Sequence, residues 1–101
     1  MRIEHKKIFD DIEIQDEIML HGIIAGNVSV KNGGILYLHG MVTKNLLVQD
    51  GGKVFLHGMV SGDITNQGGL LEVYGTILGK LHDISGLTYI DSNANFNKSN
   101  A

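Results

Sequence analysis

Residues 38–55 read LHGMVTKNLLVQDGGKVF, and this eighteen-residue unit recurs along the chain. The copy before it, residues 20–37, reads LHGIIAGNVSVKNGGILY. The copy after it starts at Leu56, reads LHGMVSGDITNQGGLLE and is one residue shorter, and a looser fourth copy, VYGTILGKLHDISGLTY, starts at Val73. Short repeats with strand-like patterning are typical of β-helices, in which each coil stacks on the next. The repeat therefore predicts the fold much more strongly than it predicts the function.

Within each copy the apolar residues fall at even positions, which is the alternation of an extended chain with one buried side. Glycines also recur at fixed positions, as expected of corners that need a positive φ or a close approach of neighbouring backbone. The apolar sets are Leu20, Leu38, Leu56 and Val73; Ile24, Val42, Val60 and Ile77; Val28, Leu46, Ile64 and Leu81; Val30 and Val48; and Leu36, Val54 and Leu71. The recurring glycines are Gly22, Gly40, Gly58 and Gly75, followed by the pairs at 33–34, 51–52 and 68–69.

A coil of this length with three corners makes a triangular turn. We therefore predict an all-β fold, a single-stranded three-sided parallel β-helix (β-solenoid), right-handed, with about five coils of 17–18 residues. Residues 1–101 would form one such domain, with a frayed start over 1–7, a degenerate capping coil over 8–19, four repeats over 20–89 and a polar tail over 90–101. An alternative for the tail is that Phe96 folds over the last coil and covers it.

Composition and charge narrow the classes of function. The net charge of −3 argues against a nucleic-acid-binding surface, which is normally basic. The chain has no cysteine, so disulfides and thiolate metal sites are excluded. No apolar run approaches the ~20 residues of a membrane helix, and the first residues, MRIEHKKIFDD, lack the apolar core of a signal peptide. We therefore expect a cytoplasmic protein that binds neither membrane nor nucleic acid.

The outward positions of the repeat carry many histidine, aromatic and methionine residues. In stacked coils they become neighbouring columns, and an apolar outer surface of this kind usually marks an interaction site. Columns of like side chains also stabilise a β-helix without any partner, so both interpretations stay open. The interface candidates are His21, Ile23, Tyr37, His39, Met41, Phe55, His57, Met59, Tyr74 and Tyr89.

The first coil is strongly acidic. Charges at the end of a solenoid discourage end-to-end stacking, and this is the simpler interpretation. The alternative is an acidic surface that docks a basic partner. The candidates for that surface are Asp10, Asp11, Glu13, Asp16 and Glu17.

The histidines at 21, 39 and 57 raise the question of a metal site. Tetrahedral ligands must converge on one ion, whereas side chains in a parallel column do not. The serines lie in no nucleophile motif, and the glycine pairs precede no helix that would bind phosphate. We therefore expect no metal, no cofactor and no catalysis, and we expect the histidine column to make the fold sensitive to acid.

One repeated phrase stands as Leu20-His-Gly-Ile-Ile-Ala-Gly-Asn-Val28 and again as Leu56-His-Gly-Met-Val-Ser-Gly-Asp-Ile64. It resembles the repeats of bactofilins, the polymer-forming cytoskeletal proteins of bacteria, over about residues 20–90. The resemblance implies a right-handed three-sided β-helix that assembles end to end without nucleotide. This chain departs from that pattern in its acidic first coil and its small number of coils.

Three functions follow as expectations. The first is a non-catalytic protein-binding solenoid that uses its outer strip or acidic coil, possible partners being a toxin domain, as for a bacterial immunity or antitoxin-type protein, and a second copy in a homodimer. The second is a bactofilin-like scaffold that self-assembles through its ends. The third is a fragment of a hexapeptide-type acyltransferase, which would need a trimer with His39 or His57 at a subunit cleft.

Overall fold

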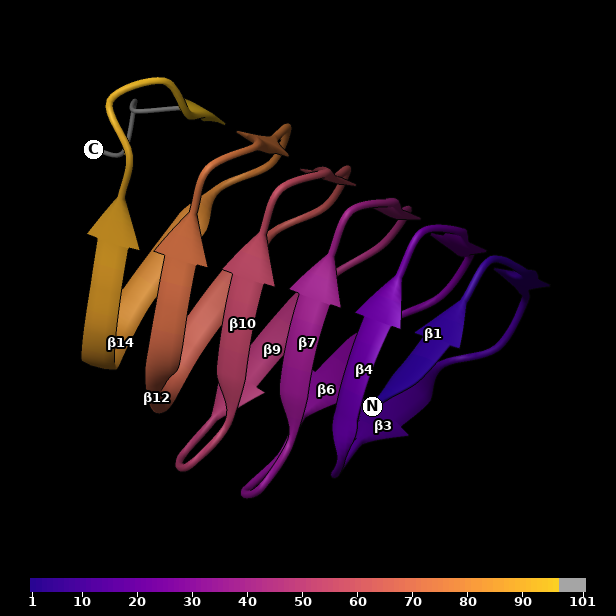
Figure 1. The fold of residues 1–101 in the computed structure, drawn as a ribbon. Coiled ribbons are helices and arrows are strands. Elements are labelled where there is room, and N and C mark those ends of the chain that lie inside the picture. Colours follow the sequence, from indigo (N-terminus) through magenta and orange to yellow (C-terminus); the bar gives the residue numbers. More distant parts are fainter. Residues whose placement is uncertain (97–101) are drawn as a thin grey trace.

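The computed structural model describes residues 1–96, and in it the chain winds into a stack of about five coils of short parallel strands (Figure 1). Each coil contributes a strand to each of three faces, and the described chain advances from one end of the stack to the other, from indigo to yellow (Figure 1). This confirms the predicted all-β solenoid. The described residues contain no helix long and apolar enough to cross a membrane.

Pairing between coils defines the three faces. The first face contains β1 (Arg2–Glu4), β4 (Glu17–Leu20), β7 (Ile35–Leu38), β10 (Lys53–Leu56) and the second halves of β12 (Ile64–Val73) and β14 (Leu81–Ile90). The second face contains β3 (Ile12–Ile14), β6 (Val28–Val30), β9 (Leu46–Gln49) and the first halves of β12 and β14. The third face contains β2 (Lys7–Ile8), β5 (Ile23–Ile24), β8 (Met41–Val42), β11 (Met59–Val60), β13 (Thr76–Ile77) and β15 (Asn95–Phe96).

The register shows how the sequence repeat becomes one coil. Met41 lies beside Met59, eighteen residues later, and both stand on the third face. Lys53 pairs with Leu70, seventeen residues later, where the third copy of the repeat is one residue shorter. Arg2 pairs with Ile18, so the first coil has only sixteen residues. Coil length therefore varies, while the strand pairs stay aligned.

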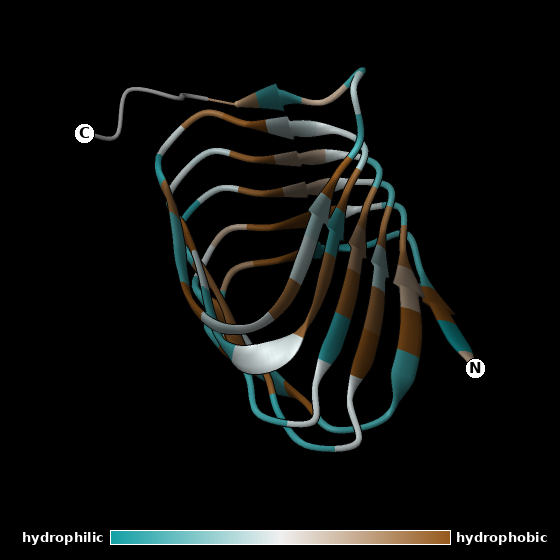
Figure 2. Ribbon diagram, turned by 90° about the vertical axis from the view of Figure 1, so that its left-hand side faces the viewer, coloured by the Kyte–Doolittle hydropathy of each residue, from teal (hydrophilic) through white to brown (hydrophobic). Residues whose placement is uncertain are grey.

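The interior is filled by columns of aliphatic side chains. Along each strand buried residues alternate with outward ones, so brown and teal segments alternate along the coils in Figure 2. Burial of these side chains is the main favourable term for a fold without helices, at roughly 1.5–3 kcal/mol for each one fully buried. The predicted apolar sets are buried as expected, except that Leu81, in the last coil, is only partly covered. Among residues 1–96 the buried apolar residues are Ile14, Ile18, Leu20, Ile24, Val28, Val30, Leu36, Leu38, Val42, Leu46, Val48, Val54, Leu56, Val60, Ile64, Leu71, Val73 and Ile77.

The shortened coil carries a buried asparagine where the preceding coils carry valine. Asn66 pairs with Val48 of the preceding coil and with Asp83 of the following one, it is fully buried, and its register with β14 shifts directly after it. Its amide nitrogen donates to the carbonyl oxygens of Gly69 and Leu87, at 3.2 and 3.1 Å, and to Thr88 Oγ1 at 3.0 Å. Its amide oxygen accepts from the backbone N–H groups of Gly68 and Gly69. The side chain thus satisfies the backbone that the missing residue leaves irregular.

Glycine is required at one corner because the coils approach too closely there for a Cβ. A Cβ on Gly58 would collide with the carbonyl oxygen of Gly40, and one on Gly40 with the carbonyl oxygen of Gly22. The glycine pairs have a different role, because Gly33 and Gly51 have φ values of 87° and 82°. These are left-handed conformations, which cost a residue with a side chain ~1–2 kcal/mol. The repeat predicts both kinds of corner.

The solenoid starts earlier than the sequence predicted. Residues 1–7 were expected to be frayed, but β1 pairs with β4 and β2 pairs with β5, so the first coil starts at Arg2. The first coil is sixteen residues long, so an alignment based on eighteen-residue copies does not detect it. Ile12 and Ile14 lie beside Val28 and Val30, as the repeat alignment predicted for the capping coil.

The solenoid also continues into the segment predicted as a polar tail. Ile90 ends β14, and β15 pairs with β13, so residues 90–96 extend the stack. Phe96 packs against the core, as in the alternative interpretation that it covers the last coil. The rest of the predicted tail, residues 97–101, lies outside the described residues.

Candidate functional site

The ten interface candidates form adjacent columns on the outside of the first face and the neighbouring edge of the third face. We call this surface the outer strip, and it consists of His21, Ile23, Tyr37, His39, Met41, Phe55, His57, Met59, Tyr74 and Tyr89. The structure therefore brings together all the residues that the sequence proposed for it. The columns arise because equivalent repeat positions are stacked at the spacing of paired strands.

The histidine column is a continuous stack of rings. His21 lies 5.2 Å from His39, and His39 lies 4.7 Å from His57, measured between ring centroids. His57 continues onto Tyr74 at 4.9 Å, and the planes of these pairs differ by 20° or less. Stacked rings shield one another from water while leaving their edges accessible.

The structure adds His5 to this column. Its ring stacks on His21 with centroids 5.1 Å apart and planes 11° apart. The eighteen-residue repeat does not predict this position, because His5 precedes His21 by sixteen residues instead of eighteen. The signal that identifies it is the pairing of Ile12 and Ile14 with Val28 and Val30, which sets the same sixteen-residue offset.

A second column runs beside the histidines and mixes aromatic and charged residues. Tyr37 and Phe55 stack with centroids 5.2 Å apart. The next residue in this column is Glu72, and Tyr89 follows it. Tyr89 is half-exposed and tilts by 52° against Tyr74 of the histidine column. The outer strip is therefore a broad surface of rings that becomes more polar toward the C-terminal end.

Carboxylates near the tyrosines keep their hydroxyls neutral. Tyr74 donates to Glu72, and this hydrogen bond, together with desolvation, raises the pKa of Tyr74 to about 12. Desolvation and the bond to Glu17 raise the pKa of Tyr37, while the charge of Asp91 raises that of Tyr89. The phenol protons of these tyrosines are thus donated to carboxylates of the same chain, and their oxygens remain as acceptors.

The third column is aliphatic. Ile23, Met41, Met59 and Thr76 follow one another on the third face, and each is partly exposed. Methionine side chains are flexible and polarisable, so they adapt to the shape of a partner. Together with the ring columns they make a flat surface of low polarity, which fits a protein partner better than a small molecule.

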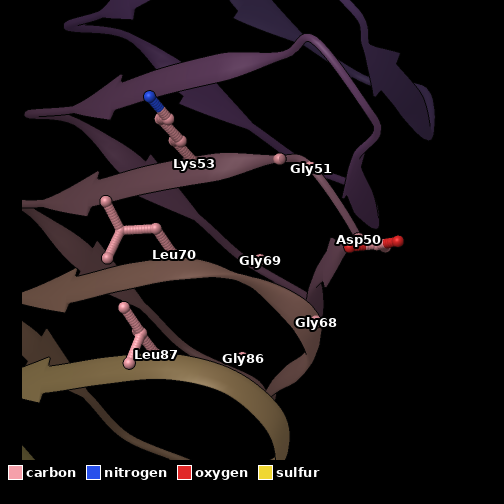
Figure 3. Close-up of a pocket in the computed structure, with 9 residues that line it drawn as sticks. Asp50, Gly51, Lys53, Gly68, Gly69, Leu70, Gly86 and Leu87 are labelled. Carbon is pink, nitrogen blue, oxygen red and sulfur yellow. The ribbon is translucent and has the colours of Figure 1, made fainter.

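A shallow groove of about 300 Å³ lies at the corner between the second and first faces (Figure 3). Glycines from three successive coils form much of its lining, and Lys53, Leu70 and Leu87 stand in a row along one side (Figure 3). Among the described residues of its lining, Asp50 carries a carboxylate and Lys53 carries an ammonium group.

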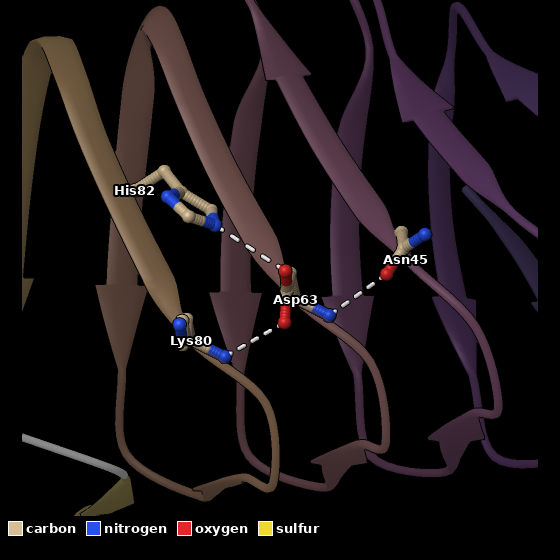
Figure 4. Close-up of polar contacts among 4 residues, drawn as sticks. All are labelled: Asn45, Asp63, Lys80 and His82. Carbon is tan, nitrogen blue, oxygen red and sulfur yellow. Dashed lines mark hydrogen bonds and ion pairs between the residues drawn. The ribbon is translucent and has the colours of Figure 1, made fainter. Parts of the chain in front are cut away.

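A column of Asn and Asp side chains connects successive coils at another corner. Asp63 N–H donates to Asn45 Oδ1 at 2.9 Å, and Asp63 Oδ1 accepts from Lys80 N–H at 2.8 Å (Figure 4). The column begins with Asp11, which accepts from Asn27 N–H, and it ends where Asp63 Oδ2 lies 3.3 Å from His82 Nε2. The backbone N–H of Lys80 and then His82 lower the pKa of Asp63. This column is structural, because each of its side chains accepts a hydrogen bond from a backbone N–H of the next coil.

The acidic candidates do not gather on one face. Glu13 lies in β3 on the second face and pairs with Lys31 Nζ at 3.3 Å. Glu17 lies in β4 on the first face, and Asp16 accepts two hydrogen bonds from the Arg2 guanidinium. This bond lowers the pKa of Asp16. Asp10 and Asp11 lie between β2 and β3, so the five acids surround the coil as a charged rim.

The arrangement of potential metal ligands can be compared with that of a metal site over residues 1–96. No group of three or more His, Asp or Glu residues within residues 1–96 is arranged to hold a metal ion. Rings stacked in parallel present their nitrogens side by side, whereas zinc requires nitrogens that converge in a tetrahedron.

Comparison with known proteins adds no family to these observations. No family model, no curated protein and no solved structure matches this chain. The resemblance to bactofilin repeats therefore stands on the repeated phrases, and the fold is compatible with it.

Proposed function

We propose that this protein is a non-catalytic binding module that docks a partner protein on its outer strip. The single observation that carries the proposal is the stack His21–His39–His57–Tyr74 beside the ring pair Tyr37–Phe55. Aromatic and methionine side chains are enriched at the centres of protein interfaces, where they supply most of the binding energy. A rigid solenoid that presents them pre-ordered loses little entropy on binding.

A specific version of this proposal is an immunity or antitoxin-type protein that neutralises a toxin domain. Support for it comes from the net charge of −3, because an acidic module suits a basic partner. In this version the rim of acids on the first coil steers the encounter, and the outer strip supplies the contact.

The test is to locate the contact surface first and measure affinity second. A photo-crosslinking amino acid replaces Met59 in the outer strip or, as a control, Thr65 on the second face, in cells that make the protein. A partner found through Met59 is purified, and its affinity is measured by calorimetry. Phe55→Asp and Met59→Asp are expected to weaken it at least tenfold, whereas Thr65→Asp leaves it unchanged. Equal affinity for all variants would show that the outer strip is not the docking surface.

A second candidate, a self-assembling scaffold, is favoured by the C-terminal end of the stack. Within residues 1–96, β14 pairs on one side only, with β12, and exposes Ile84 and Leu87. An open strand edge with apolar side chains is a template for another chain. At the other end, Arg2 and Glu4 occupy the positions of the buried Ile18 and Leu20, so stacking there would bury charge.

Light scattering separates the two candidates. Large species that grow with protein concentration and disappear in an Ile84→Lys, Leu87→Lys variant would support the scaffold. A discrete monomer or dimer over the same range of concentration would support the binding module.

A further inference from the structure

We propose that the outer strip also pairs with a second copy of itself, with the two solenoids antiparallel about a two-fold axis that passes between the third and fourth coils. This inference rests on the proposed function, because it takes the outer strip to be a docking surface and names one partner for it. The strand register fixes the order of residues in each column, and this order favours the antiparallel pairing.

The columns match their own reversal in kind at the third and fourth coils. From the first coil to the last, the ring column beside the histidines reads Ile3, Met19, Tyr37, Phe55, Glu72, Tyr89. The column on the third face reads Lys7, Ile23, Met41, Met59, Thr76, Asn95. The histidine column reads His5, His21, His39, His57, Tyr74, and Asp91 follows it, since Asp91 N–H bonds to the carbonyl oxygen of Val73.

Reversal places like side chains together at the centre. About an axis between the third and fourth coils, Tyr37 faces Phe55 of the second copy and Met41 faces Met59. Likewise, the ring of His39 in one copy faces the ring of His57 in the other, next to the axis. An isologous interface requires this self-complementarity, since each contact occurs twice. Aromatic and methionine contacts at the centre are the arrangement in which binding energy concentrates.

Charge at the two ends favours the antiparallel orientation. In the first coil the outward residues include His5 and Lys7, and in the last coil they include Asp91. Reversal brings Asp91 of one copy opposite His5 of the other and within one coil of Lys7. A parallel arrangement would instead place equivalent coils together and so set Asp91 beside Asp91. Like charges opposed in this way are costly, so the ends select the orientation.

The size of the face is close to what a dimer needs. The protein measures 35 × 23 × 21 Å, so a long side projects about 700–800 Å² on each copy, close to the ~800 Å² per partner of a typical specific interface. The pairing is therefore expected to depend on concentration.

Single cysteines test the pairing and its orientation, because the natural chain has no cysteine. Ile23 faces Thr76 of the second copy in the antiparallel dimer, whereas Ile23 is about 14 Å, three coil spacings, from its own equivalent. Under mild oxidation, a mixture of Ile23→Cys and Thr76→Cys proteins is expected to form a mixed disulfide dimer. Either variant alone is expected to form at least fivefold less disulfide-linked dimer.

Sedimentation equilibrium of the unmodified chain provides the second measurement. A monomer–dimer equilibrium that Met59→Asp abolishes and Thr65→Asp leaves unchanged supports the proposal, provided that circular dichroism shows both variants folded. Homodimeric disulfides from Ile23→Cys alone would overturn the antiparallel orientation. A monomer at all concentrations would overturn self-pairing, and the crosslinking from Met59 would still decide separately whether the outer strip docks another protein.

Discussion

His39 and His57 stack ring on ring, with centroids 4.7 Å apart and planes 5° apart, although eighteen residues separate them in the sequence. Two further histidines and a tyrosine extend the stack. The stack presents a row of rings at the surface and sets four imidazole groups next to one another in one column.

Acid is therefore expected to destabilise the fold. Two imidazolium groups about 5 Å apart in water repel by ~1 kcal/mol, and salt reduces this value. Thermal melts at pH 7.5 and 5.5 are expected to show a loss that His39→Gln, His57→Gln reduces. An equal loss in this variant would exclude the histidine column as its cause.

Replacing the buried amide is expected to cost more than a surface change. Asn66→Val restores the valine of the preceding coils but leaves the N–H groups of Gly68 and Gly69 without their acceptor. We expect a loss of ~2–4 kcal/mol in the free energy of unfolding, measured by urea titration. Asn66→Asp keeps the acceptor for these N–H groups and loses the amide donors, so its loss of stability is expected to come from the missing donors. A Val variant as stable as the parent would show that the bulge does not need the amide.

Two glycines that look alike in the sequence are expected to tolerate alanine differently. Gly58→Ala would drive a Cβ into the carbonyl oxygen of Gly40, so the coils must separate and the expected cost exceeds ~3 kcal/mol. At Gly33 the nearest atom to a Cβ is 3.6 Å away, so Gly33→Ala costs only the strain of its positive φ, ~1–2 kcal/mol. Urea titrations of the two variants compare these values directly, and the reverse order would contradict the assignment of the two corners.

The Asp63 carboxylate is expected to contribute stability that is lost in acid. Its pKa is lowered in the folded chain by the backbone N–H of Lys80 and then by His82. A lowered folded pKa adds stability above the ordinary carboxyl range, and this stability is lost as the pH falls through the folded value. Asp63→Asn keeps an acceptor for Lys80, as Asn45 does for Asp63, and is expected to remove this part of the acid dependence.

The matched control at this position is Asp63→Ala, which removes the acceptor itself. It is expected to lower the melting temperature at pH 7 by several degrees, more than Asp63→Asn does. Identical melting curves for the two variants at pH 7 would show that the hydrogen bond to Lys80 contributes nothing measurable.

The core and the outer strip were predictable because a parallel solenoid converts sequence spacing into spatial neighbourhood. Val42 and Val60 are buried, and His39 and His57 stack, since each pair is one coil apart. The prediction failed where the coil length changed. His5 was missed at an offset of sixteen residues, and the repeat did not align Asn95 with Thr76, because their offset is nineteen.

The sequence by itself determined the alternation of buried and outward residues, the corners that require glycine and the members of the outer strip. These are local properties that repeat once in every coil, so the sequence of a single coil is enough to specify them. Tertiary structure alone decided that Asn66 bonds to Leu87 and Thr88, and that the five acids of the first coil surround it instead of forming one patch. Such relationships depend on how irregular coils of sixteen to nineteen residues settle on one another, and hydrogen-bond geometry, which no repeat spacing encodes, decides that outcome.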